Sequence, residues 1–288
     1  MGGTTALDSV LRQASAVRVG PVSGDAELRV ELADSAEAAR LRAAMAVDSI
    51  PDSYCMCLGD VRFELLDRDG GQLDSVVLHH GSALRWSGWE GDAVLADGRL
   101  LLGWLAGHGM PGPLEQFEAE RRAGEKRRAQ RREWLAAMPA GLDGFADRIL
   151  GASPFDLAGE AELCDELVAR LREELPDPVE RALALLAWFG AGSGRCSGHP
   201  SYEGMPGKVL AAMPITDLLS ALADPRADER HVAGAVRHLV GWKSRPDQER
   251  DVAALPDGLR ARLLAHARRS GDTDKQSRAE GWLAPGRS

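Results

Sequence analysis

The sequence predicts an α+β protein in which a small antiparallel sheet with helices is followed by an all-α domain. Short runs of period two with brief turns fill the first third of the chain, whereas helical spacing cut by Pro, Gly and Asp fills residues 142–285. A length of 288 residues favours two domains over one. We expect an α+β domain over residues 1–113, a charged connecting helix over 114–138 and an all-α domain over 139–288.

Alternating apolar residues locate the strands of the first domain. Residues 16–19 are mostly apolar, and residues 27–32 alternate between polar and apolar side chains, as two half-buried strands would. The turn at 67–71 is rich in Asp and Gly, which supply the positive φ angles of a tight hairpin. Residues 54–66 and 72–86 are therefore expected to pair antiparallel as the centre of the sheet.

Helices are expected to lie across this sheet. One short helix covers residues 5–14, and a second begins at Asp34, buries Leu41 and carries Glu37 as the partner of Asp34 in a capping box. A leucine-rich stretch around Trp104 predicts a third helix, which ends at the glycines and prolines that follow it.

The connecting segment has the composition of a solvated helix. Acidic and basic residues are mixed between positions 118 and 133, and oppositely charged pairs three or four apart stabilise a helix by a few tenths of a kcal/mol each. Its basic side chains can instead bind an acidic partner, but a solvated face is the more common outcome. These side chains are Arg121, Arg122, Lys126, Arg127, Arg128, Arg131 and Arg132.

The last half of the chain shows helical spacing and no convincing strand. Candidate helices are 142–150, 160–175, 178–189, 206–212, 215–223, 228–241, 248–253 and 257–269. Short antiparallel helices predict either a bundle or a HEAT-like stack of helix pairs. Because the sequence has no repeat of fixed period, an irregular bundle is the expected arrangement.

Composition excludes several classes of function. The chain carries 44 acidic against 35 basic residues, a formal net charge of −9, so its mean field repels nucleic acid. It has no apolar run long enough for a membrane span and no signal peptide at its start. Four cysteines are too few for a disulfide scaffold, which makes them thiols or metal ligands. We therefore expect a cytoplasmic protein.

Cys55, Cys57, His79 and His80 are the strongest candidates for chemistry, because thiolates and imidazoles are ligands of zinc and copper. An extended backbone at residues 54–58 would point both thiols to one face. Consecutive histidines in a strand point to opposite faces, so that only one joins the thiols easily. A four-ligand site would need a bend after the second histidine. The Cys-x-Cys spacing is also a weaker metal signal than Cys-x-x-Cys.

The two cysteines have other interpretations. As small hydrophobic residues, Cys55 and Cys57 would belong to the core, where free cysteines are most often found. This packing interpretation is the expected one. Thiol chemistry is the remaining alternative, and it would need His79 or Arg85 nearby to lower a thiol pKa.

Arg85, Trp86 and Trp89 lie near a predicted strand end, where binding sites are often built. The guanidinium of Arg85 can bind a carboxylate or phosphate, with an indole ring as a stacking surface. The alternative, which the clustering of charges favours, is that the tryptophans are core residues and that Arg85 pairs internally with Asp60 or Asp92.

A glycine-rich loop at residues 190–203 is the candidate binding feature of the second domain. Cys196, His199, Tyr202 and Glu203 are closely spaced in it and offer a nucleophile, a base and an acid, or ligands of a metal. A phosphate-binding loop needs a strand before it, whereas an apolar helix precedes this one. The structural alternative, an ordered loop that closes the bundle, is the expected one.

Two segments resemble a pattern found in bacterial proteins of no assigned activity. The first combines Tyr54-Cys-Met-Cys-Leu-Gly-Asp60, Leu78-His-His-Gly and Leu84-Arg-Trp86, and this resemblance covers residues 16–117. The second, Trp-Phe-Gly-Ala-Gly-Ser-Gly followed by His-Pro-Ser-Tyr-Glu, is similar to a segment of actinobacterial proteins. The resemblance implies no activity, cofactor or site residue.

Two functions follow from these features. The expected one is a noncatalytic cytoplasmic interaction protein, such as a regulator, an adaptor or a toxin-neutralising immunity protein, which binds another protein and needs no cofactor. The alternative is a metal-binding protein or metalloenzyme that holds zinc or copper at Cys55, Cys57, His79 and His80.

Overall fold

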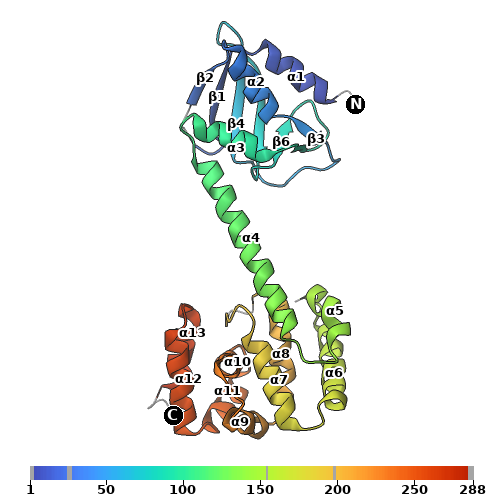
Figure 1. Cartoon of the computed structure of the whole chain (residues 1–288), viewed down its shortest axis with the longest axis vertical. Coiled ribbons are helices and arrows are strands. Elements are labelled where there is room, and N and C mark those ends of the chain that lie inside the picture. The colour runs from blue at the N-terminus through green and yellow to red at the C-terminus, as the bar shows by residue number, and fades with distance from the viewer. Residues whose placement is uncertain (1–2, 25–27, 154, 197–198, 285–288) are drawn as a thin grey trace. The chain divides into compact units, whose positions relative to one another are not determined.

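A computed structural model describes residues 3–24, 28–153, 155–196 and 199–284 of the chain. Within these residues a seven-stranded antiparallel sheet in the N-terminal half is followed by a run of helices, which confirms the predicted α+β fold class. The chain divides into two compact units, Met1–Glu125 and Lys126–Ser288 (Figure 1). None of the described helices combines the length and the apolar character needed to cross a bilayer.

The sheet of the first unit has the strand order β2-β1-β4-β5-β6-β7-β3. Its strands are β1 (Ala16–Pro21), β2 (Leu28–Glu31), β3 (Val47–Ser49), β4 (Val61–Leu66), β5 (Gln72–His79), β6 (Ala83–Trp86) and β7 (Ala93–Leu95). The expected hairpin is its centre: β4 pairs with β5 around the Asp- and Gly-containing turn, with Phe63 opposite Val76. In β4, Val61, Phe63 and Leu65 are buried while the residues between them are less so, as the period of two predicts.

Three helices, α1 (Gly3–Gln13), α2 (Ser35–Ala44) and α3 (Gly98–Gly107), complete the first unit, and Figure 1 shows them lying against the sheet. Leu11, Leu41 and Leu105, one from each helix, are buried in a single hydrophobic core with the strand residues. Burial of each such side chain contributes about 1.5–3 kcal/mol.

The second unit is all helical among its described residues. Its helices are α5 (Ala146–Gly151), α6 (Leu157–Glu174), α7 (Pro178–Gly190), α8 (Met205–Ala211), α9 (Ile215–Ala223), α10 (Glu229–Leu239), α11 (Arg245–Ala253), α12 (Asp257–Arg269) and α13 (Thr273–Leu283), with short 3₁₀ turns at Asp143–Phe145 and Ser201–Gly204. Helices α7 and α10 pack closely, because Gly190 and Gly234 remove the side chains at their crossing. Trp134 and Trp188 stack at the centre of the core, with ring centroids 4.9 Å apart.

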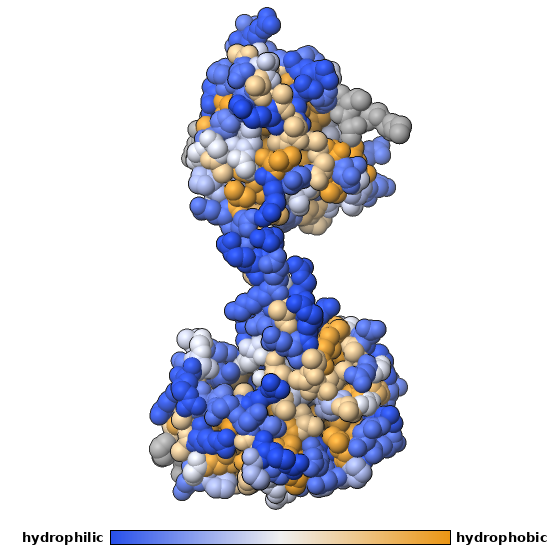
Figure 2. Space-filling model, viewed as in Figure 1, coloured by the Kyte–Doolittle hydropathy of each residue, from blue (hydrophilic) through white to orange (hydrophobic). Residues whose placement is uncertain are grey.

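The charged segment forms a helix, α4 (Gly112–Ala136), two residues earlier than expected at both ends. Leu114 and Phe117 pack against the core of the first unit, and Trp134 is buried in the core of the second. Between these ends the helix is exposed and hydrophilic (Figure 2), with ion pairs such as Arg121–Glu125 at the expected spacing. The domain limits drawn from the sequence stay a prediction.

Two local expectations are wrong. Residues 54–60 form an irregular loop instead of continuing β4. Asp34 caps α2 through the amide of Ala36, but Glu37 does not close the capping box. The carboxylate of Glu37 instead accepts the indole N–H of Trp104 at 2.5 Å and pairs with Arg40, because a tertiary partner competes with the local one.

Candidate metal centre

Two thiols and an imidazole meet at one point of the first unit. The Sγ atoms of Cys55 and Cys57 lie 3.0 Å apart, and Nε2 of His80 lies 3.3 Å from each of them. All three ligand atoms lie within 4.8 Å of one another. The two cysteines are half-buried and His80 is exposed, so that the group is open to solvent.

A backbone bend at the end of β5 brings His80 to the thiols. The strand ends at His79, and His80 has a φ of 52°, the one positive value among the non-glycine residues that the structure describes. Its amide donates to the Asp60 carboxylate at 2.5 Å, and Gly81 continues the bend with a φ of 66°. Because this left-handed conformation costs a non-glycine residue about 1–3 kcal/mol, the bend points to a functional position.

Arg85 and Asp92 fix the backbone of the cysteine loop. The Arg85 guanidinium donates to the carbonyl oxygens of Cys55 and Cys57, at 2.6 and 3.2 Å, and forms a two-bond ion pair with Asp92 at 2.7 and 2.8 Å. The Asp92 carboxylate also accepts the amide N–H of Cys55 at 2.6 Å. Hydrogen bonds from Arg85 lower the pKa of Asp92, which keeps the carboxylate charged. The internal pairing expected for Arg85 is therefore present, with Asp92 as its partner.

His79 lies behind Cys57 and is fully buried. Its Nδ1 is 3.1 Å from the Cys57 sulfur, while its Nε2 has no hydrogen-bond partner among the described residues. Burial lowers the pKa of His79, so the ring is neutral near pH 7 and carries one N–H. A proton on Nδ1 reaches the sulfur, whereas a proton on Nε2 would be buried without an acceptor. His79 thus donates to Cys57 and orients it.

The surroundings favour a thiolate at the cysteine pair. The thiol and backbone amide of Cys57, with the imidazole of His80, lower the pKa of Cys55 to about 7. The neighbouring Cys55 sulfur raises the pKa of Cys57, and the same sulfur raises the pKa of His80. The first proton therefore leaves this pair at a lower pH than it leaves an ordinary thiol. A metal ion needs a deprotonated sulfur of this kind.

The spacing of the three ligand atoms fits a transition-metal ion. Their separations are 3.0, 3.3 and 3.3 Å. A cation can lie about 2.2 Å from all three corners of such a triangle, within the range of Zn–S and Zn–N bonds. This arrangement can hold a soft cation and leave one position for water or another ligand.

The expected packing role of the cysteines is wrong. Cys55 and Cys57 are half-buried, and neither belongs to the hydrophobic core of the first unit. Their immediate neighbours are polar: each sulfur contacts His80, and the Cys57 sulfur also contacts His79. The side chain between them, Met56, is fully exposed. The polar contacts outweigh the apolar tendency of the cysteine side chain because the loop lies outside the sheet.

Trp86 and Trp89 belong to the core of the first unit, with exposures of 7% and 5%. Their rings meet edge to face at 5.2 Å, and the Trp86 indole N–H donates to Asp74 at 2.7 Å. The Trp89 carbonyl accepts the hydroxyl of Tyr54 at 2.7 Å, which ties the start of the cysteine loop to the core. These two rings support the loop and present little surface for stacking a ligand.

The predicted binding residues of the second half lie in the other unit, in the loop that follows α7. Glu203 is 1% exposed and forms an ion pair of 2.8 Å with Arg237, which is 3% exposed. It also accepts hydrogen bonds from the amide and hydroxyl of Ser193 at 2.9 Å each. Residues 197–198 of the loop lie outside the described residues. The contacts of Glu203 are those of a buried structural pair.

The other three members of this group, Cys196, His199 and Tyr202, lie in different environments. Cys196 is buried, and burial raises the pKa of its thiol to about 11, which leaves almost no thiolate near pH 7. His199 is exposed, and the ring of Tyr202 packs edge-on against Trp134 at 5.2 Å. These positions favour the structural alternative for the loop.

One pocket of the first unit lies beside the candidate metal centre. It measures about 420 Å³, adjoins His80 and is lined by apolar side chains such as Leu102 and Phe117, with the acidic groups of Asp60 and Glu120. Its volume lies in the range of small-molecule sites. Its presence beside the candidate metal centre leaves room for a ligand there.

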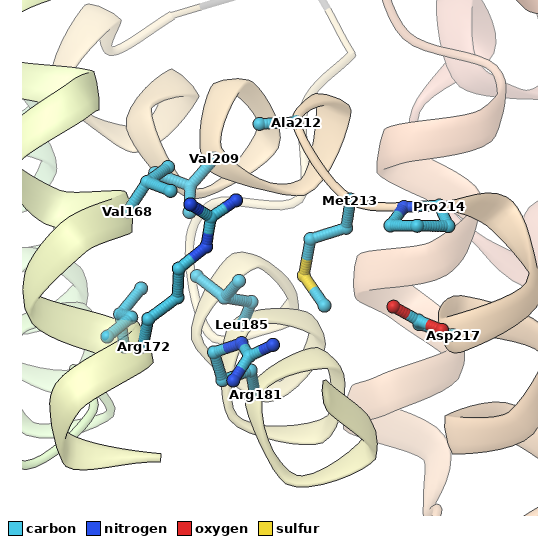
Figure 3. A pocket seen from close by; sticks show the side chains of 10 residues that line it. Val168, Arg172, Arg181, Leu185, Val209, Ala212, Met213, Pro214 and Asp217 are labelled. Carbon is cyan, nitrogen blue, oxygen red and sulfur yellow. The ribbon is translucent and has the colours of Figure 1, made fainter. Parts of the chain in front are cut away.

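A second pocket lies in the second unit among α6, α7, α8 and α9 and measures about 50 Å³. Figure 3 shows the Met213 side chain pointing into it, with Arg181 and Asp217 to either side. A space of this size admits one or two water molecules. It is too small for a metabolite.

Comparison of the chain with protein-family models, curated proteins and solved structures finds no match.

Proposed function

We propose that this protein binds a zinc ion through Cys55, Cys57 and His80. The observation that carries the proposal is the meeting of two sulfurs and one imidazole nitrogen within 3.3 Å. Thiolate and imidazole are the donors that zinc takes in proteins, and three protein ligands leave a fourth position for water or another ligand. Copper(I) accepts the same donors and is the competing ion.

The surroundings of these ligands support the proposal. The Arg85–Asp92 pair holds the backbone at both cysteines, so that little loop entropy is lost on binding. His79 donates to the Cys57 sulfur, as the outer partners of metal ligands do. The half-exposed thiols leave an entry path for the ion.

Metal analysis of untagged protein tests the proposal. Protein dialysed against zinc and then against buffer should retain one zinc per chain, and a Cys55→Ser/Cys57→Ser double variant should retain none. Cobalt(II) should give near-ultraviolet sulfur-to-cobalt charge-transfer bands in the wild type. The matched control is Cys164→Ser, which removes a part-buried thiol of the second unit and should keep the metal.

Each outcome decides the proposal. Equal, substoichiometric metal in the wild type and the double variant would rule out a specific site. Retention of copper(I) but not of zinc would show that the same ligands bind copper(I) instead of zinc. A stoichiometric zinc that survives the double substitution would place the site elsewhere in the chain.

The interaction role expected from the sequence stays a prediction. The exposed side chains of Tyr54, Met56 and Leu58 around the cysteines favour it, because neighbouring apolar groups on a surface often mark a contact. Such a role is compatible with zinc binding, because these apolar side chains are not the proposed ligands.

A further inference from the structure

We infer that Cys55 and Cys57 form a redox-active dithiol, which small-molecule disulfides oxidise to an intramolecular disulfide, and that this disulfide and bound zinc exclude each other. The oxidation itself follows from the geometry of the two thiols. Only the mutual exclusion rests on the proposed zinc site.

The two sulfurs are close to bonding distance. They lie 3.0 Å apart, and a disulfide bond measures about 2.05 Å, so closure needs a movement of about 1 Å. Rotation of the two side chains can supply this movement. Met56, which separates them, is fully exposed, so that no packing at the tip of the loop opposes it.

The loop backbone keeps both thiols on one side. One guanidinium, that of Arg85, donates to the carbonyl oxygens of both cysteines, and Asp92 accepts the amide of Cys55. The half-buried pair is also within reach of a reagent in solution, whereas Cys196 is 4% exposed. Accessibility and proximity therefore select this pair among the four cysteines.

The reaction is a balanced two-electron exchange. The Cys55 thiolate attacks one sulfur of a disulfide R–S–S–R, the S–S bond breaks, and one RS⁻ leaves. Cys55 attacks first because both sulfurs contact each other and His80, whereas the Cys57 sulfur also contacts the buried His79. The Cys57 thiolate then attacks the Cys55 sulfur of this mixed disulfide and releases the second RS⁻. The two thiol protons end on the two released thiolates.

Bound zinc and the disulfide cannot coexist. A disulfide removes two of the three proposed ligands, because zinc binds the deprotonated sulfur. Bound zinc in turn coordinates the Cys55 thiolate, which then cannot attack the small-molecule disulfide. At free zinc a hundredfold above its Kd, the metal-free fraction and hence the oxidation rate should fall about 100-fold.

Reaction of the reduced full-length chain with glutathione disulfide tests the inference. Tryptic cleavage after Arg42 and Arg62 gives a peptide, residues 43–62, that contains Cys55 and Cys57 and no other cysteine. After alkylation of free thiols, mass spectrometry should find this peptide two hydrogens lighter and unalkylated. Dithiothreitol should reverse the change, and preloaded zinc should delay it.

Two variants separate the two halves of the inference. Cys57→Ser should stop at the glutathione adduct of Cys55. His80→Asn, in which the asparagine tolerates the left-handed backbone, should lose zinc and still close the disulfide at a rate that zinc no longer affects. Disulfide closure in a wild-type chain that binds no zinc would support the redox-active dithiol and contradict the proposed zinc site.

Three results would overturn the inference. A wild-type peptide that carries two glutathione adducts, or that stays reduced while Cys164 reacts, would show that the pair does not close. Equal closure rates with and without zinc, in protein shown to hold the metal, would end the mutual exclusion.

Discussion

Asp92 is the residue on which the geometry of the cysteine loop depends most. Its carboxylate accepts the Cys55 amide and two hydrogen bonds from Arg85, and its side chain is only 8% exposed. Asp92→Asn keeps the shape of the side chain and removes its charge. We expect zinc affinity to fall about 10–100-fold, the usual cost of altering a group that supports a metal ligand.

Competition with a chromophoric chelator measures this loss. Asp74→Asn is the matched control, because Asp74 accepts the indole N–H of Trp86 in the same sheet and is not among the contacts of the cysteine loop. Its zinc affinity should stay within a factor of two or so of wild type. An equal loss of zinc affinity in both variants would indicate general destabilisation of the sheet. Unchanged zinc affinity in Asp92→Asn would show that Asp92 does not support the cysteine loop.

The sequence predicts the donors of the site but not their arrangement. Adjacent cysteines and histidines indicate thiolate and imidazole ligands by residue type alone. A regular strand would have placed His79 and His80 on opposite faces. Both histidines approach Cys57 because the backbone of His80 is left-handed. The amide N–H of His80 donates to Asp60, a residue twenty positions away. A contact of this range cannot be derived from local pattern.

His238 of α10 links stability to pH in the second unit. Its Nε2 lies 2.7 Å from Nζ of Lys243, which in turn pairs with Asp251 at 2.7 Å. Burial, followed by the Lys243 charge, lowers the pKa of His238 to about 3. The folded protein therefore keeps this ring neutral down to about pH 3, whereas the unfolded chain protonates it near pH 6.5.

The unfolded state binds the extra proton, so the contribution of His238 is complete above pH 6.5 and declines as the pH falls toward 3. We expect His238→Gln to reduce the slope of unfolding free energy against pH by about 1.3 kcal/mol per unit near pH 5. Urea unfolding of the full chain, monitored by pulsed hydrogen exchange in α10, measures this slope. Parallel slopes in the two proteins would contradict the assignment.

Glycines at the crossing of α7 and α10 allow the two helix backbones to touch. A Cβ atom at Gly234 would lie 2.0 Å from the carbonyl oxygen of Leu186, and one at Gly190 would lie 2.0 Å from that of Arg230. Both obstacles are backbone atoms, which cannot rotate away. Gly234→Ala should therefore destabilise the second unit by about 1–3 kcal/mol, although alanine is the better helix former.

The same substitution should have the opposite sign at Gly281 of α13, where a Cβ atom would meet nothing within 4 Å. Gly281→Ala should stabilise the helix by about 0.5–1 kcal/mol through propensity alone. Urea unfolding monitored in α7 and α13 compares the two variants. Stabilisation by Gly234→Ala would show that the helices separate without cost.

The sequence predicts elements with a strong local signal well, and it misses short or weakly patterned ones. The helices at residues 215–223 and 257–269 match the structure at both ends. Strand β3 at the edge of the sheet has three residues and pairs with β7, so its identity depends on a partner almost fifty residues away. The last helix, α13, was missed because its composition is largely polar and only Lys275, Ala279 and Leu283 are buried.

Each unit has its own hydrophobic core, and the candidate zinc ligands all belong to the first. A ligand that binds only the folded first unit stabilises that unit by mass action. At zinc a hundredfold above its Kd, the gain is about 2.7 kcal/mol. Amides of β4 and β5 that exchange through unfolding of this unit should then exchange about 100-fold more slowly.

Hydrogen exchange of the full chain with and without zinc tests this expectation, with α7 and α10 as the internal reference. Their amides should exchange at unchanged rates, because the described ligands include no residue of the second unit. Protection that extends equally to α10 would mean that the two units unfold together or that zinc binds at a second place. Absence of protection in β5, where His79 lies beside the cysteine pair, would contradict binding at the proposed ligands.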